Sequence, residues 1–273
     1  MIKKKLRWKK IDKSTLTATR SNIITLFDAS PDPFLVAQFT FSAEAILELI
    51  ASEKQRTGKS STITFTVMKM LAMAIAKHKE FNSLVLGGNI YELEDVSITV
   101  PFLIPGEDKE LAGLIFENPQ DMTLEEIHDA SLAMMKQQQT AKATKSRRMQ
   151  RLLPSLFIKT GLHRLLGEKF FYRFMHEHGL GSNFVLTNAS HRGKARFFIT
   201  KCAIQILRTF TRFYLHGIQE NPVVEDGKIV PRKQITLSIA VDHRMIDGIH
   251  LNEFLETLEE LADNPVALVG AQT

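Results

Sequence analysis

The chain has 273 residues, of which 44% are hydrophobic and 24% are charged, a composition typical of a globular protein. Its 35 Lys and Arg residues exceed the 30 Asp and Glu residues by five. This excess is smaller than nucleic-acid-binding proteins usually carry, and no nucleic-acid-binding module is recognisable, so we expect no nucleic-acid partner. The single cysteine, Cys202, excludes a disulfide scaffold and a thiolate metal site, and it favours a reducing compartment.

No sequence feature indicates a membrane span or secretion. The most apolar stretch, residues 65–76, contains Lys69 and is too short to cross a bilayer. The basic first ten residues lack the apolar run and the cleavage site of a secretory signal. We therefore expect a cytoplasmic protein. Because no internal repeat and no Gly/Ser- or Pro-rich linker divides the sequence, we expect a single domain over residues 1–273.

Strands and helices alternate along the first 140 residues. Residues 34–41 (FLVAQFTF) predict a strand, and Ser42 is a candidate cap for the helix that follows it. The other elements expected here are a largely buried helix over 64–77, strands at 84–86, 96–104 and 111–116, and a helix over 123–139.

Residues 142–173 differ in character because many Lys and Arg residues are interleaved with Leu, Ile and Phe. This pattern predicts a basic amphipathic helical insertion, which we place at residues 141–180. The simplest interpretation is a solvated pair of helices that covers the core. Binding of an anion, of a partner protein or of an anionic membrane surface remain alternatives.

Strands return in the second half of the chain. They are expected at residues 183–187, 197–200, 202–207, 213–218 and 234–241. Between the last two, Asp226 and Gly227 form a sequence typical of a two-residue hairpin turn. The chain closes with an amphipathic helix over 248–262, which Asn264 and Pro265 end.

His243 lies where a side chain can meet a ligand. The run ITLSIAVDHRMIDG carries a long alternating strand into a charged, turn-like segment. A neutral imidazole accepts a proton near neutral pH, so a histidine at the end of a strand is suited to general-base work. Asp247 follows four residues later, and Gly248 is expected to permit a tight turn into the last helix.

None of the other eight histidines has neighbours in the sequence that indicate a catalytic or binding role. His78, His128, His176, His178 and His191 lie in polar or mixed surroundings, and we expect them to be exposed. His176 and His178 are two residues apart, a spacing that points the two rings to different faces of a helix. We therefore predict no metal site.

Taken together, these blocks resemble the catalytic domain of the dihydrolipoamide acyltransferases of 2-oxoacid dehydrogenase complexes, in the superfamily of chloramphenicol acetyltransferase. The resemblance begins near Arg20, continues over residues 81–127, and returns at GSNFVLTN, PVVEDGKIV and ITLSIAVDHRMIDGIHLNEFLETLEELADNP. It implies an α/β (α+β) two-layer sandwich with a mixed sheet.

The resemblance also implies roles for individual residues. His243 matches the general base that takes a proton from the group attacking an acyl-CoA thioester. Thr187 falls where the family keeps a hydroxyl that donates to the oxyanion of the tetrahedral intermediate. Asp247 resembles a carboxylate that holds the loop through an arginine. The residues expected to support the site are Gly248, Arg20 and Asn188.

The family forms homotrimers with the active site between subunits, so the resemblance implies that His243 and Thr187 face each other from neighbouring chains. It implies acyl-CoA as a substrate, no permanently bound cofactor and no metal. No lipoyl or peripheral-subunit-binding domain is recognisable. The acceptor is therefore expected to be a thiol, hydroxyl or amine, on a small molecule or on a lipoyl or acyl carrier protein supplied in trans. The alternative is a catalytically inactive trimeric scaffold of the same fold.

Overall fold

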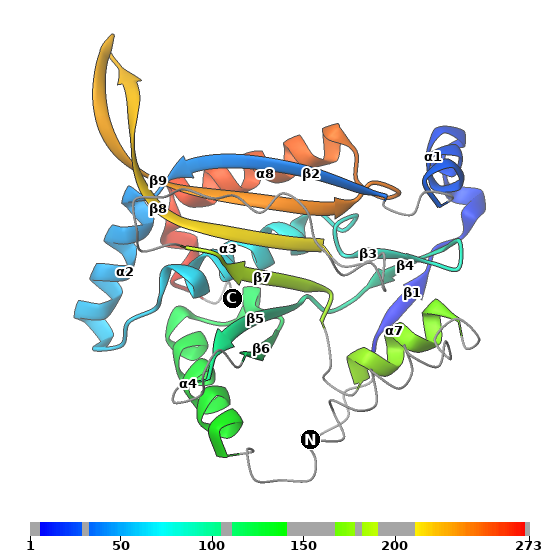
Figure 1. Ribbon diagram of the computed structural model, residues 1–273, viewed down its shortest axis with the longest axis horizontal. Coiled ribbons are helices and arrows are strands. Elements are labelled where there is room, and N and C mark those ends of the chain that lie inside the picture. Colours follow the sequence, from blue (N-terminus) through cyan, green and yellow to red (C-terminus); the bar gives the residue numbers. More distant parts are fainter. Residues whose placement is uncertain are drawn as a thin grey trace.

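The computed structural model describes residues 6–28, 33–104, 111–140, 167–177, 182–190 and 211–270 (Figure 1). The strands expected at 197–200 and 202–207, with Cys202, lie outside the described residues, as do His178, His191 and most of the basic segment. None of the helices within the described ranges is long and apolar enough to cross a membrane.

A six-stranded mixed sheet runs through the described chain in the order β2-β9-β8-β7-β5-β6. β7 is parallel to both of its neighbours, β5 and β8, and all other pairs are antiparallel. The predicted mixed sheet is therefore confirmed. Its strands are β2 (Phe34–Ser42), β5 (Ser97–Leu103), β6 (Leu111–Glu117), β7 (Phe184–Asn188), β8 (Thr211–Glu225) and β9 (Lys228–Asp242).

Helices cover one face of this sheet and complete a two-layer arrangement (Figure 1). They are α2 (Glu44–Thr57), α3 (Ile63–Lys77), α4 (Leu124–Thr140) and α8 (Gly248–Asp263). The alternation in β9 explains which face they cover. Ile235, Leu237 and Ile239 are fully buried in the core shared with the helices, and the polar Thr236 and Ser238 point to the opposite face.

A smaller sheet in the order β1-β4-β3 lies beside α7 (Glu168–Glu177), whose Phe171 and Tyr172 are buried in one cluster with its strands. β1 and β4 were not predicted from the sequence. The strands are β1 (Trp8–Lys10), β3 (Ser83–Leu86) and β4 (Asn89–Leu93). Short 3-10 turns are η1 (Lys13–Thr15), η2 (Pro119–Asp121) and η4 (Pro265–Leu268).

β8 and β9 form a long hairpin that extends beyond the rest of the sheet (Figure 1). Its two-residue turn is the predicted Asp226-Gly227 pair, with φ of 50° and 75°. Positive φ at both positions is the geometry that matches the twist of a hairpin, and it explains why Asp and Gly are found there. The predicted hairpin is confirmed.

Two local expectations are wrong. Ser42 ends β2 and does not cap α2; the N-cap is Ala43, although the Ser42 hydroxyl accepts a long hydrogen bond, 3.4 Å, from the Glu44 backbone N–H. His78, His128 and His176 are partly buried instead of exposed. Tertiary contacts cover these rings, and a local sequence window does not contain such contacts.

Candidate active site

The loop after β9 holds the imidazole of His243 at the end of the sheet. The backbone N–H of His243 donates to the carbonyl of Pro33 at 2.7 Å, which joins the loop to the start of β2. Nδ1 lies 2.8 Å from the carbonyl oxygen of Ile246. Because a carbonyl can only accept, Nδ1 carries the proton and the lone pair of the neutral ring is on Nε2. This is the tautomer that a general base needs.

One side of a helix that the sequence did not predict, α1 (Ala18–Asp28), covers this loop. Arg20 and Phe27 are seven residues apart and therefore share a helix face. Arg20 Nη2 donates to Asp247 Oδ2 at 2.6 Å, and its Nη1 donates to the carbonyl of Arg244 at 3.3 Å. The Phe27 ring stacks on the imidazole of His243 with 4.7 Å between ring centroids. α1 thus fixes both the loop and the ring.

Arg244, next to His243, holds the loop from inside. Its side chain is 1% exposed. Nη2 donates to Asp242 Oδ2 and Nη1 to Asp28 Oδ1, both at 2.7 Å. A buried guanidinium without carboxylate partners would be destabilising by several kcal/mol, so the two aspartates are needed to keep it there. No role was predicted for these three residues from the sequence, although the opposite charges of Asp242 and Arg244 on either side of His243 could have indicated an ion pair.

Asp247 lies between Arg20 and His250 at the start of α8. His250 Nδ1 is 2.6 Å from Asp247 Oδ1. Partial burial raises the pKa of Asp247, but the hydrogen bond from Arg20 and the interactions with His250 outweigh it and hold this pKa below its ordinary value. His250 was not among the residues predicted from the sequence. Its position, three residues after a helix-capping Asp, matches the spacing of a capping box and could have indicated it.

Gly248 does not play the backbone role expected of it. It is the first residue of α8, its φ is not positive, and a Cβ built on it would meet no atom within 4 Å. The turn into α8 is held by the contacts of Asp247 and does not need the conformational freedom of a glycine.

Thr187 lies on β7, opposite Tyr214 of β8, and is partly buried. The neighbouring Asn188 holds the end of this strand. Its Nδ2 donates to the hydroxyl of Thr64 on α3 at 2.8 Å, and its Oδ1 accepts from the backbone N–H of Ser190 at 2.9 Å. Asn188 thus joins the strand that carries Thr187 to a helix of the core.

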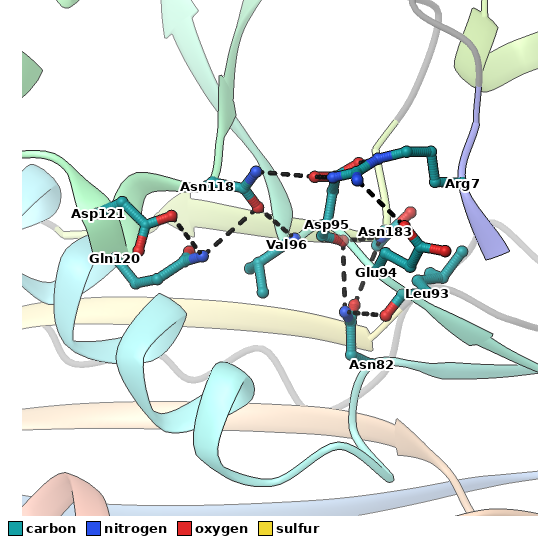
Figure 2. A network of polar contacts seen from close by, with 10 residues as sticks. All are labelled: Arg7, Asn82, Leu93, Glu94, Asp95, Val96, Asn118, Gln120, Asp121 and Asn183. Carbon is teal, nitrogen blue, oxygen red and sulfur yellow. Dashed lines mark hydrogen bonds and ion pairs between the residues drawn. The ribbon is translucent and has the colours of Figure 1, made fainter. Parts of the chain in front are cut away.

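The other end of β7 is held by a polar network (Figure 2). Asn183, directly before β7, donates to the backbone carbonyl of Asp95 at 3.2 Å. The Asp95 carboxylate accepts from Arg7 Nε at 2.9 Å and from Asn118 Nδ2 at 2.8 Å. Asp95 is 7% exposed, so these bonds also satisfy a buried charge. β7 is therefore fixed at both ends, and Thr187 has a defined place in the sheet.

Within one chain the structure does not bring Thr187 and His243 together. Thr187 is in register with Tyr214 of β8, which is in register with Ser238 of β9, so His243 lies five residues further along the sheet and two strands away. With a rise of about 3.3 Å per residue and about 4.8 Å between strands, this separation is on the order of 15 Å or more. Groups that act on one reacting centre must lie within about 3 Å of its atoms.

Residues 177–269, about a third of the chain, match the model of the 2-oxoacid dehydrogenases acyltransferase family (catalytic domain). A dihydrolipoyllysine-residue succinyltransferase component of the mitochondrial 2-oxoglutarate dehydrogenase complex, from Saccharomyces cerevisiae, is 43% identical over 51 residues. These residues make up 19% of this chain and 11% of the yeast protein, so the aligned part is a small share of either.

The fold resembles that of solved structures over almost the whole chain. A dihydrolipoamide acetyltransferase from Azotobacter vinelandii superposes with a TM-score of 0.63 and 16% identity, covering 96% of this chain and 94% of that one. A chloramphenicol acetyltransferase superposes with a TM-score of 0.57 and 10% identity, covering 94% and 100%. The predicted chloramphenicol acetyltransferase-like fold is confirmed, and the predicted family resemblance is confirmed over residues 177–269.

Proposed function

We propose that this protein is a CoA-dependent acyltransferase that moves an acyl group between a CoA thioester and a thiol, hydroxyl or amine acceptor. The observation that carries the proposal is the hydrogen bond from His243 Nδ1 to the Ile246 carbonyl, because it leaves Nε2 as the basic nitrogen. The match of residues 177–269 to an acyltransferase family adds support from the sequence.

The spacing of the candidate residues adds a second line of support. The catalytic mechanism of the Azotobacter vinelandii enzyme has been studied through a serine, a histidine and an asparagine, and the asparagine is the fourth residue after that histidine. Asp247 is likewise the fourth residue after His243, and Thr187 supplies a hydroxyl upstream. An aspartate in place of asparagine suits a position that receives an Arg20 guanidinium.

In the proposed reaction, His243 Nε2 takes the proton of the acceptor, whose sulfur, oxygen or nitrogen attacks the thioester carbonyl. The carbonyl oxygen becomes an oxyanion, and the Thr187 hydroxyl donates a hydrogen bond to it; one such donor contributes roughly 3 kcal/mol to transition-state stabilisation. The carbon–sulfur bond then breaks, and the CoA thiolate takes the proton back from His243. No covalent acyl-enzyme is required.

We propose that each site is formed by two chains of a homotrimer. The separation of Thr187 from His243 within one chain supports this arrangement, because a second copy is the simplest source of the missing group. We propose a cytoplasmic setting, in which acyl-CoA is available. The acceptor is a small molecule or the carrier arm of a lipoyl or acyl carrier protein in trans. The positive charge of residues 142–173 would attract an acidic carrier, the phosphates of CoA or an anionic membrane surface.

The test is transfer by the purified protein from a panel of acyl-CoAs to dihydrolipoamide, carrier proteins and small alcohols and amines, followed by mass spectrometry. The variant His243→Ala should lower the rate by about 100- to 10,000-fold, the usual contribution of a general base, while circular dichroism shows an unchanged fold. His128→Gln is the matched control, because His128 lies on α4 with its Nδ1 bonded to the Ser60 carbonyl, away from the loop after β9, and its rate should equal that of the wild type.

Transfer by His243→Ala at the wild-type rate would contradict the proposed role of this histidine. A wild-type protein that neither transfers an acyl group to any acceptor of the panel nor binds CoA at millimolar concentration in calorimetry would instead be the inactive scaffold.

A further inference from the structure

Two side chains at the end of α3 meet a third from the distant α8, and the proposed reaction uses none of them. His78 is the C-cap of α3, Glu80 follows two residues later, and Glu253 lies on α8. One nitrogen of His78 and one carboxylate oxygen of each glutamate lie within 4.8 Å of one another.

The hydrogen bonds of Thr257 indicate which nitrogen of His78 carries the proton. The Thr257 hydroxyl donates its only proton to the carbonyl of Glu253 at 3.1 Å. The same oxygen lies 2.8 Å from His78 Nε2, so it must accept there and Nε2 must carry the proton. In the neutral ring the lone pair is therefore on Nδ1.

His78 Nδ1 is directed at negative charge. It lies 3.6 Å from Glu80 Oε1, which is beyond hydrogen-bonding distance. The side chain is 11% exposed and lies edge-on to Phe81 and Phe254, with centroid distances of 6.5 and 5.9 Å, so it has little freedom to turn away. A lone pair held beside a carboxylate is unfavourable unless a positive charge lies between them.

We propose that His78, Glu80 and Glu253 bind one divalent transition-metal ion of the Zn²⁺ class. One imidazole nitrogen and two carboxylate oxygens are a ligand set that Zn²⁺ accepts, with water in the remaining position. With bonds of about 2.0–2.1 Å, the ligand atoms of a tetrahedral site lie about 3.4 Å apart. Glu253 is exposed on the helix surface and its flexible side chain can close that difference.

Thr257 would not bind the metal itself but would hydrogen-bond a residue that does. Its oxygen accepts from the nitrogen of His78 that does not bind the metal, and this contact fixes the tautomer and the orientation of a metal-bound imidazole. The ion would join the end of α3 to the second turn of α8, whose first turn is held by Asp247. The sequence showed no metal spacing because two of its ligands lie at residues 78 and 80 and the third at 253.

The test is metal binding by the tag-free protein after treatment with EDTA. Calorimetry with Zn²⁺ should give one site per chain, and Co²⁺ as a probe should give visible absorption bands that Zn²⁺ abolishes. Glu253→Gln should remove both signals. Glu259→Gln makes the same change at an exposed position further along α8, outside the cluster, and should bind as the wild type does.

A second pair of variants tests the orientation of the ring. Thr257→Val keeps the shape but not the acceptor and should weaken Zn²⁺ binding by about 10- to 100-fold, the usual effect of losing an outer partner, whereas Thr257→Ser should restore it. The proposal is wrong if the wild type gives no Zn²⁺ heat at millimolar concentration. It is equally wrong if Glu253→Gln binds Zn²⁺ as the wild type does. Neither readout depends on acyl transfer.

Discussion

The tautomer and the orientation of the His243 imidazole depend on two contacts of its own ring. The hydrogen bond to the Ile246 carbonyl selects the basic nitrogen, and the stacked ring of Phe27 holds the imidazole in its orientation. Asp247 contributes differently. Its carboxylate is hydrogen-bonded to Arg20 and His250, whereas the aspartate of a protease triad is hydrogen-bonded directly to the catalytic histidine. Asp247 therefore acts on the loop that carries His243.

A prediction at this scale concerns Asp247→Asn. The pKa of Asp247 is depressed in the folded chain, so the carboxylate stabilises the fold above its unfolded pKa of about 3.9, and this stabilisation is lost as the pH falls through the lower folded value. The variant should lower the free energy of unfolding at pH 7 by about 1 kcal/mol. It should also reduce the change in that free energy between about pH 5 and pH 3.

The measurement is urea unfolding followed by circular dichroism at several pH values. Asp263→Asn is the control, because Asp263 is exposed at the last residue of α8, and its pH profile should follow the wild type. Identical pH profiles for Asp247→Asn and the wild type would show that the contacts with Arg20 and His250 do not stabilise the ionised carboxylate.

At the scale of elements, the site depends on how β7 is held and on how β8 passes it. β8 has an irregular register between Leu215 and Ile218, where Gly217 has a φ of 84°. A Cβ at Gly217 would lie only 2.7 Å from Cβ of Ser190. The backbone N–H of Ser190 in turn donates a hydrogen bond to Asn188 Oδ1, at the end of the strand that carries Thr187. Glycine is needed here both for its conformation and for the space.

Gly217→Ala is therefore expected to lower the free energy of unfolding by roughly 2 kcal/mol or more, from the left-handed backbone and the overlap with Ser190. Because the overlap displaces the segment after Thr187, kcat for acyl transfer should fall as well. Urea unfolding and initial-rate kinetics measure the two effects.

Gly248→Ala is the control for the effect of Gly217→Ala on the free energy of unfolding, because it is the same substitution at another site. Gly248 has neither a positive φ nor an atom within 4 Å of its Cβ position, so this variant should unfold at the same urea concentration as the wild type or above it. If Gly217→Ala and Gly248→Ala lower the free energy of unfolding equally, a side chain at position 217 does not strain the fold.

At the scale of the whole molecule, the separation of Thr187 and His243 predicts that activity belongs to the assembly. If each site takes its hydroxyl from one chain and its imidazole from the next, two different inactive variants can complement each other. An interface at which a Thr187→Ala chain supplies His243 and a His243→Ala chain supplies Thr187 contains both intact groups.

Co-expression of Thr187→Ala and His243→Ala chains in equal amounts should therefore restore roughly a quarter of the wild-type sites in randomly assembled trimers. Each variant alone should stay about 100-fold or more below the wild-type rate. The control is a chain that carries both Thr187→Ala and His243→Ala, co-expressed with either single variant. No interface in that mixture contains both intact groups. A mixture no more active than its parents would place both groups of a site on one chain or remove one of them from the reaction.

The sequence by itself determined the local structure and the candidate base. The alternation of β9, the Asp-Gly turn and the amphipathic α8 are patterns within short windows, and they predicted the corresponding elements because side-chain periodicity reflects burial. His243 was identified in the same way, from its place at the end of a strand. β1 and α1 were missed because their formation depends on partners: β1 pairs with β4, and α1 packs on the loop after β9.

Only the tertiary structure decided which distant groups meet. Arg244 and Asp28 are 216 positions apart, and the cluster of His78, Glu80 and Glu253 joins two helices. The register of β7, β8 and β9 separates Thr187 from His243 within one chain. Such contacts are set by strand pairing and helix packing, which bring together residues that no sequence window contains. The sequence could therefore indicate the candidate groups, while the pairing of the strands determined that one chain does not hold both at one centre.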